Sequence, residues 1–180
     1  MFGGTLTALV TPFRDGGVDE AALRGLVDTQ IDAGIDGLVP CGSTGESATL
    51  SHAEHGQVVE IVLAAARGRV PVVAGTGSNN TQEAIDLTRH AQEAGAAGAL
   101  LISPYYNKPT QEGIIAHYEA VASETRFPLV VYNIPGRTAS NMLPETVRRL
   151  AENPYVVGIK EASGDLEQMS QVIASCPDDF

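Results

Sequence analysis

Residues 156–162 read VVGIKEA, a run rich in β-branched residues that ends in a lysine followed by a glutamate. The run follows an Asn-Pro pair at 153–154, which breaks regular structure, so the pattern predicts a short and fully buried strand. Successive residues of a strand face opposite sides. Gly158 and Lys160 therefore share one face and Glu161 takes the other, so Lys160 has no acidic neighbour on its own face.

The lysine at the end of this strand has two interpretations. In the first, Lys160 marks the solvated end of the strand, with its stem on apolar surface and its ammonium group in water. In the second, burial lowers the lysine pKa from its usual value of about 10.4, and the neutral amine can attack a carbonyl group. The rest of the chain must decide between them.

Composition limits the classes of protein that are possible. With 180 residues, 43% of them hydrophobic, the chain can bury one sizeable core, and we expect residues 1–180 to form a single domain or part of a larger one. The 22 acidic residues outnumber the 11 basic ones, giving a formal net charge of −11. This charge opposes binding to nucleic acid and to anionic membranes.

Cysteine usage and hydropathy indicate where the protein works. Cys41 and Cys176 lie far apart, which predicts neither a disulfide framework nor a thiolate metal site and fits a reducing cytoplasm. The first residues do not resemble a secretory signal, and the longest apolar stretch is too short for a bilayer. We therefore expect a cytoplasmic protein.

Six short apolar runs recur about every 30 residues, with helical patterns between them. The helices have recognisable starts, namely Ser51 with Glu54, Asn80 with Glu83, Asp165 with Gln168, and Pro144 at a first helical position. The spacing predicts a parallel α/β sheet, and a G-x-G-x-x-G turn after the first run is lacking. The runs are TLTALVTP, DGLVPCGST, VPVVAGTGS, GALLISPYY, PLVVYNIP and VVGIKEAS.

This repeat favours a (β/α)₈ barrel of which the chain supplies about six units, ending where a seventh strand would begin. In such a barrel the chemistry gathers at the carboxyl ends of the strands. Those ends are rich in polar residues, whereas the opposite strand ends have fewer of them. They are Ser43-Thr44-Gly45-Glu46, Gly75-Thr76-Gly77, Tyr105-Tyr106-Asn107-Lys108, Tyr132-Asn133, Arg137-Thr138 and Lys160-Glu161.

Several of these side chains suit amine chemistry on a carbonyl compound. Tyr132 ends the strand before that of Lys160, so the two can meet at matching heights and Tyr132 can move protons; the alternative is an interior aromatic residue with a satisfied hydroxyl. Arg137 follows a Pro-Gly turn and can grip a carboxylate, or it is an ordinary surface arginine. Ser43 and Thr44 can hold a carboxylate or relay a proton, or they belong to a helix-capping turn.

The motifs GSTGES at 42–47, SPYYNKPTQEG at 103–113, YNIPGRT at 132–138 and GIKEASG at 158–164 together resemble the dihydrodipicolinate synthase family over the whole chain. The resemblance implies that Lys160 forms a covalent Schiff base with pyruvate, whose enamine adds to aspartate semialdehyde before a ring closes. Neither a metal nor an organic cofactor is implied.

The resemblance also assigns roles to the other site residues. Tyr132 relays protons together with Thr44 and with Tyr106, which reaches in from a neighbouring subunit, so a homo-oligomer is implied, a dimer of dimers when full length. Arg137 holds the carboxylate of the aldehyde substrate, and Ser43 lies with Thr44 in the substrate-binding turn. The full-length family continues through a seventh and an eighth strand.

A feedback site for lysine at a dimer interface is a further implication. His52 and His55 lie one helical turn apart, but without a third ligand they predict no metal site. The resemblance instead gives them to a site for lysine as an effector. Its residues are Ser47, Ala48, His52, His55, Asn79, Glu83 and Tyr105.

Two other hypotheses stay open. One is a different pyruvate-dependent aldolase, of the N-acetylneuraminate lyase or 2-keto-3-deoxy-acid aldolase type, although Arg137 favours the synthase. The other is a catalytically inactive barrel fragment whose open strand edges are satisfied by another copy or by a further segment.

Overall fold

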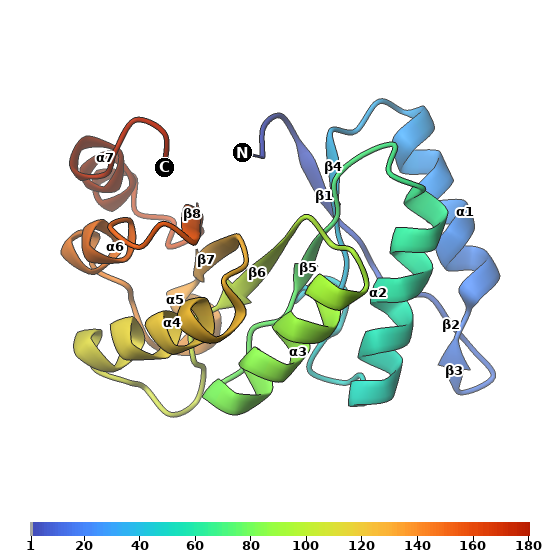
Figure 1. Ribbon diagram of the computed structural model, residues 1–180, viewed down its shortest axis with the longest axis horizontal. Coiled ribbons are helices and arrows are strands. Elements are labelled where there is room, and N and C mark those ends of the chain that lie inside the picture. Colours follow the sequence, from blue (N-terminus) through green and yellow to red (C-terminus); the bar gives the residue numbers. More distant parts are fainter. Residues whose placement is uncertain (1) are drawn as a thin grey trace. The chain divides into compact units, whose positions relative to one another are not determined.

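The structure is a computed structural model that describes residues 2–180 (Figure 1). Contacts divide the chain into two compact units. The first comprises the chain up to Thr76 together with Arg89–Ala99, and the second comprises Gly77–Thr88 and Leu100–Phe180. Helix α3 (Thr81–Glu93) and strand β6 (Gly98–Ile102) each have residues in both units.

The first unit is built on short strands with two covering helices. Strands β1 and β4 are parallel in the register Leu6↔Gly37 to Ala8↔Val39. Strand β5 continues the layer, because Leu38 forms a parallel bridge with Val72. The elements are β1 (Leu6–Ala8), β2 (Phe13–Arg14), β3 (Gly17–Val18), α1 (Glu20–Asp32), β4 (Gly37–Val39), α2 (His52–Ala66) and β5 (Val73–Gly75).

Helices α1 and α2 pack against each other in this unit. Leu23 and Val27 of α1 and Val59 and Val62 of α2 are fully buried. The predicted start of α2 is confirmed: Ser51 and Glu54 form a reciprocal capping box, which satisfies two backbone N–H groups that the first turn leaves unpaired.

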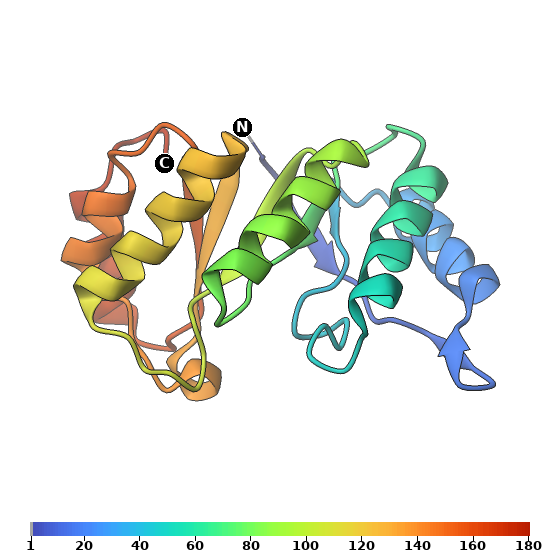
Figure 2. The same ribbon diagram turned by 60° about the horizontal axis from the view of Figure 1, so that its bottom comes forward.

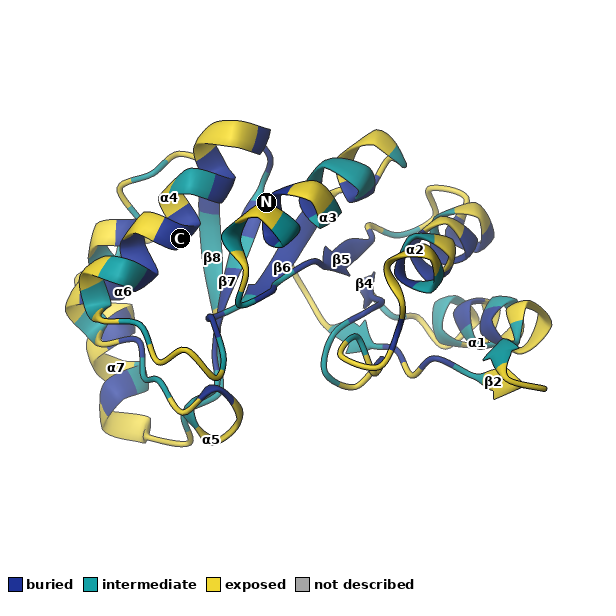
Figure 3. Cartoon of the chain, turned by 90° about the horizontal axis from the view of Figure 1, so that it is seen from below, coloured by how far each residue is buried: buried dark blue, intermediate teal, exposed yellow. Residues whose placement is uncertain are grey.

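The second unit has β6, β7 and β8 as neighbours in one sheet. Figures 2 and 3 show α4, α6 and α7 along one side of it. Tyr118, Ile114, Leu129, Met142 and Leu150 are fully buried in its core. Its further elements are α4 (Gln111–Thr125), β7 (Leu129–Asn133), α5 (Pro135–Thr138), α6 (Pro144–Leu150), β8 (Val156–Glu161) and α7 (Leu166–Ser175).

The other predicted helix starts in this unit are also confirmed. The Asn80 side chain accepts hydrogen bonds from the backbone at the start of α3, Pro144 opens α6, and Asp165 caps α7 by accepting from Glu167 N and Gln168 N. Each cap matches the side-chain type that the first helical turn requires.

Strand β8 differs from the expectation of a fully buried strand. Only Val156 is buried, Val157 to Ile159 are half-buried, and Lys160 is exposed. In Figure 3 the strand is accordingly coloured mostly as intermediate. The physical reason is its position: within residues 2–180, β8 pairs with β7 alone, so its other edge has no neighbouring strand.

The hairpin of β2 and β3 was not predicted. Phe13 pairs with Val18 and Arg14 with Gly17. Asp15 and Gly16 both have positive φ, 53° and 85°, as the tight two-residue turn requires. The Asp-Gly pair is the sequence signal that could have located it.

No helix in the described part of the chain is long and apolar enough to cross a membrane. Among residues 2–180, no group of three or more His, Cys, Asp or Glu side chains is arranged to hold a metal ion.

Candidate active site

Lys160 and Tyr132 meet at the carboxyl ends of two neighbouring strands. Strands β7 and β8 are parallel, and their register pairs Tyr132 directly with Lys160. The Nζ atom of Lys160 lies over the Tyr132 ring, 4.5 Å from its centroid. The expectation that these two side chains stand at matching heights is therefore confirmed. A position beside Gly158 stays open, since a side chain there would meet nothing within 4 Å.

The surroundings of Lys160 favour its neutral form. Partial burial lowers the lysine pKa below its usual value, and the positive charge of Arg137 lowers it further. The side chain as a whole is nevertheless exposed, so only part of it loses contact with water. The direction of the pKa change is the one that an amine nucleophile requires.

Arg137 lies in α5, the short helix that follows β7. Pro135 occupies its first turn, and the Arg137 N–H donates to Ile134 O at 2.9 Å. The Arg137 side chain is exposed. The turn thus sets an always charged guanidinium group near Lys160, where it can meet the carboxylate of a bound molecule.

Tyr106 lies in the loop between β6 and α4. It is 87% exposed and has a φ of 73°, an uncommon value for a residue with a large side chain. Asn107 anchors the loop, because its Nδ2 donates to Asn79 O at 3.0 Å and its N–H donates to Tyr105 O at 2.9 Å. The loop holds an aromatic hydroxyl in solvent.

Ser43 and Thr44 lie in the first unit, in the turn after β4. The hydroxyl of Thr11 donates to Gly45 O at 2.7 Å and holds this turn in place. A side chain at Gly45 would come within 3.0 Å of Leu9 O. The turn does not cap a helix, since α2 begins at His52 and its cap is Ser51. Of the two hydroxyl residues, Thr44 is exposed and Ser43 half-buried.

The residues expected to bind lysine are divided between the units. Ser47, Ala48, His52 and His55 belong to the first, and Asn79, Glu83 and Tyr105 to the second. His55 is buried, and its Nε2 lies 2.7 Å from Gly75 O, so it ties α2 to β5. Glu83 contacts the Ser78 hydroxyl through its carboxylate. His55 therefore has a structural contact that the sequence did not predict.

Sequence reasoning missed a polar network next to the Lys160–Tyr132 pair. Asn133 and Glu161, the next register pair, join Asn141 and Gln168 through side-chain hydrogen bonds. An asparagine directly after the apolar run of β7 is the one signal that could have pointed to it.

The fold and the site together define a parallel α/β protein with a lysine and a tyrosine paired at the carboxyl ends of adjacent strands. Residues 1–180 match the profile of the dihydrodipicolinate synthetase family. The chain belongs to this family.

Two curated relatives bear the same description, 4-hydroxy-tetrahydrodipicolinate synthase. The protein of Syntrophus aciditrophicus is 60% identical over 180 residues, covering 100% of this chain and 62% of the relative. That of Nitratidesulfovibrio vulgaris is also 60% identical, covering 99% of this chain and 62% of the relative. The chain thus spans about 62% of the length of the relatives it matches.

Solved structures agree on the fold. The 4-hydroxy-tetrahydrodipicolinate synthase of Methylacidiphilum fumariolicum SolV is 47% identical with a TM-score of 0.97, covering 98% of this chain and 59% of that one. The dihydrodipicolinate synthase of Acinetobacter baumannii, solved in complex with pyruvate, is 47% identical with a TM-score of 0.94, covering 97% and 60%. That of Cyanidioschyzon merolae, solved with lysine bound, is 43% identical with a TM-score of 0.96, covering 99% and 62%. The chain therefore has the fold of about six units of a (β/α)₈ barrel.

Proposed function

We propose that this protein is a Schiff-base lyase that condenses pyruvate with aspartate semialdehyde to 4-hydroxy-tetrahydrodipicolinate, a step of lysine biosynthesis. The observation that carries the proposal is the Lys160–Tyr132 pair, with Nζ 4.5 Å from the ring centroid, in a member of the dihydrodipicolinate synthetase family. The names of its relatives support the same reaction.

The nucleophile is the neutral amine of Lys160. It attacks the keto carbon of pyruvate, and the resulting carbinolamine loses water to give the Schiff base. Loss of a proton from the methyl group then gives an enamine, whose carbon adds to the aldehyde. Water or an internal amine finally releases Lys160, so the nitrogen is regenerated. The covalent link makes a metal or organic cofactor unnecessary for these steps.

Each of these steps moves a proton, and the centroid of the Tyr132 ring lies 4.5 Å from the reacting nitrogen. The ring is buried, with 6% exposed, and faces Lys160 Nζ. A positioned acid–base group typically accelerates such steps by about 10²- to 10⁴-fold. We assign the proton relay to Tyr132 with Thr44 and Tyr106, and the substrate-binding turn to Ser43 and Thr44.

We assign to Arg137 the binding of the carboxylate of the aldehyde substrate. A guanidinium group can form two parallel hydrogen bonds with a carboxylate, which fixes orientation as well as binding. Arg137 is exposed and close enough to Lys160 to influence the lysine pKa. A substrate bound between the two would carry its aldehyde toward the enamine.

A homo-oligomeric protein in the cytoplasm, a dimer of dimers when full length, is also part of the proposal. Tyr106 is 87% exposed, so its ring and hydroxyl are accessible to another molecule. We propose that Tyr106 enters the site of a neighbouring copy of the chain, as the family resemblance implies. Lysine is proposed as an effector at Ser47, Ala48, His52, His55, Asn79, Glu83 and Tyr105. The lysine complex of the Cyanidioschyzon merolae protein supports this. Unchanged activity in millimolar lysine would count against the effector site.

The test measures which compounds the purified chain consumes, with nuclear magnetic resonance as the readout. We expect pyruvate to be consumed together with aspartate semialdehyde, and Lys160→Arg, which keeps the positive charge without a usable amine, to abolish the reaction. Cleavage of N-acetylneuraminate or of a 2-keto-3-deoxy acid instead would favour the other aldolases. A folded chain that consumes none of these compounds would support the inactive-fragment hypothesis.

A further inference from the structure

Glu161 directly follows Lys160 and lies on the opposite face of β8. Its carboxylate accepts hydrogen bonds from three donor groups. Asn133 Nδ2 donates at 3.0 Å to Oε2, Gln168 Nε2 donates at 3.1 Å to the same oxygen, and the Ser163 N–H donates at 2.7 Å to Oε1. Three donors hold the carboxylate in one position, and with it the backbone next to Lys160.

Asn141, which lies between α5 and α6, completes the arrangement. Its Oδ1 accepts from Asn133 Nδ2 at 2.9 Å and from Gln168 Nε2 at 3.2 Å, and its Nδ2 donates to Gln168 Oε1 at 2.7 Å. We call Asn133, Asn141, Glu161 and Gln168 the amide–carboxylate cluster. Its four members come from β7, from the loop before α6, from β8 and from the first turn of α7.

The cluster is buried where its amides meet. Asn133 is fully buried and Gln168 is 7% exposed. The second polar atom of Asn133 is also used, because Oδ1 accepts from Met142 N at 2.9 Å. A satisfied buried network of this kind fixes one arrangement, since any displacement leaves a polar group without a partner.

The placement of the cluster links it to the reacting side chains. Asn133 and Glu161 are register partners, one residue beyond the pair of Tyr132 and Lys160. The segment that carries Arg137 leaves β7 at Asn133 and returns to the cluster at Asn141. The cluster therefore holds both ends of that segment and both strand ends.

We propose that the amide–carboxylate cluster is a positioning device for the reaction, with Glu161 at its centre, which sets Lys160 against Tyr132 and Arg137. The inference rests on the proposed function for its purpose, and its test does not need pyruvate. Glu161 does not touch the reacting atoms; it acts through the backbone of Lys160 and is a positioning residue.

A test can use the reactivity of the amine itself, because the chain contains two lysines, Lys160 and Lys108. Trace reductive methylation at a series of pH values, read by peptide mass spectrometry, gives the titration midpoint of each. Lys108, in the exposed loop before α4, is the internal reference. The charged and titratable neighbours of Lys160 identified in the structure are Arg137 from α5, Tyr132 from β7 and Glu161 on its own strand.

In Glu161→Gln, the direction in which the Lys160 titration midpoint moves distinguishes a positioning role of Glu161 from the effect of its charge. Loss of a negative charge alone would lower the Lys160 midpoint. If the cluster positions Lys160, the substituted amide meets N–H donors on either side, the strand end loosens, and the midpoint rises toward that of an ordinary lysine. We expect the rise. A lower or unchanged midpoint in folded Glu161→Gln would overturn the proposal.

Two further variants keep the proposal testable if Glu161→Gln does not fold. Gln168→Met removes a cluster member without changing any charge, so positioning predicts the same rise and an unmoved midpoint contradicts it. The double variant Glu161→Gln with Gln168→Glu exchanges the amide and the carboxylate of one hydrogen-bonded pair. We expect it to restore the Lys160 titration midpoint of the parent chain. Glu167→Gln, an exposed acid in the same helical turn, is the matched control and should leave Lys160 as in the parent chain.

Pyruvate trapping by borohydride separates failure of the cluster from failure of the proposed function. At saturating pyruvate we expect Glu161→Gln to slow trapping on Lys160 by roughly 10- to 100-fold, with recovery in the double variant. If the parent chain traps no pyruvate, the proposed function fails, while the amine titration still decides on the cluster. Equal trapping rates in parent and Glu161→Gln would overturn the positioning role.

Discussion

At the scale of single residues, the chemistry depends on how far Lys160 is kept from water and from negative charge. Strand alternation and parallel pairing predict that Lys160 and Tyr132 meet, and the register confirms it. They do not predict how exposed Lys160 is, because exposure depends on what lies beyond the other edge of β8. The amide–carboxylate cluster was also beyond prediction, since its contacts depend on the path of the segment between Asn133 and Asn141.

Arg137 is predicted to help keep Lys160 neutral. In Arg137→Gln we expect the titration midpoint of Lys160 to move to higher pH, because removing a nearby positive charge raises the lysine pKa. Lys108 should titrate as before. Arg137→Lys keeps a positive charge at this position, so a midpoint closer to that of the parent is expected, and a full shift there would contradict the electrostatic explanation. Amine labelling with peptide mass spectrometry measures all three variants.

His117 is predicted to make stability depend on pH. Burial lowers the pKa of His117 to about 4, and its Nδ1 lies 2.9 Å from the Thr81 hydroxyl. The unfolded chain binds a proton near its ordinary value of about 6.5, so between these values the unfolded state holds more protons and stability falls as the pH falls. The full loss amounts to at most about 3 kcal/mol and is complete below pH of about 4.

Denaturant unfolding across this pH range measures the effect. His117→Gln retains a hydrogen-bonding group and cannot be protonated there, so we expect a flatter pH dependence. His90→Gln replaces a half-buried histidine paired with Glu60 and serves as the control, in which the loss of stability at low pH should remain. An unchanged pH dependence in His117→Gln would show that another group is responsible.

At the scale of elements, the sequence predicts the strands and helices well because their signals are local. All six apolar runs contain strands, and the helix caps at Ser51, Asn80 and Asp165 are formed. The hairpin at residues 13–18 escaped notice because its strands are too short to show periodicity. The sequence also does not show where two elements pack closely, because a glycine at such a contact is recognised only in the folded structure.

Gly75 is a test of such packing. A Cβ atom at Gly75 would lie 2.2 Å from Cys41 O, and this backbone oxygen cannot rotate away as a side chain can. We expect Gly75→Ala to lower the free energy of unfolding by about 1–3 kcal/mol. Gly25, exposed within α1 with nothing within 4 Å, is the matched control, and Gly25→Ala should raise stability by about 0.5–1 kcal/mol. Equal effects of the two substitutions in denaturant titrations would contradict this explanation.

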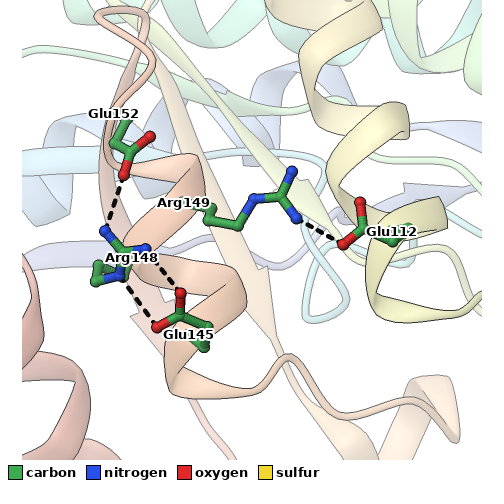
Figure 4. Close-up of polar contacts among 5 residues, drawn as sticks. All are labelled: Glu112, Glu145, Arg148, Arg149 and Glu152. Atoms are coloured by element: carbon green, nitrogen blue, oxygen red, sulfur yellow. Dashed lines mark hydrogen bonds and ion pairs between the residues drawn. The ribbon is translucent and has the colours of Figure 1, made fainter.

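At the scale of the whole molecule, stability rests on the two buried cores rather than on surface charge. Arg148 pairs with Glu145 and Glu152, and Arg149 reaches Glu112, but all these groups are exposed (Figure 4). Exposed ion pairs of this kind contribute about 0–1 kcal/mol. The single-domain organisation of residues 1–180 stays a prediction, since contacts divide the chain into two units.

The reach of sequence reasoning also ends at this scale. Regular spacing of strands predicts a (β/α)₈ barrel, and the solved relatives bear this out. Strand spacing does not encode the exposure of β8 or of Tyr106, which belongs to the folded chain. The functional proposal therefore has to be tested on the chemistry of Lys160 itself.

The most direct measurement is the intact mass of the chain after incubation with pyruvate and borohydride, followed by peptide mapping. Borohydride reduces the Schiff base and fixes pyruvate on the lysine nitrogen. We predict one adduct, located on Lys160, with Lys108 unmodified. No adduct on a folded chain, or equal modification of both lysines, would contradict an activated amine at Lys160 and with it the proposed function.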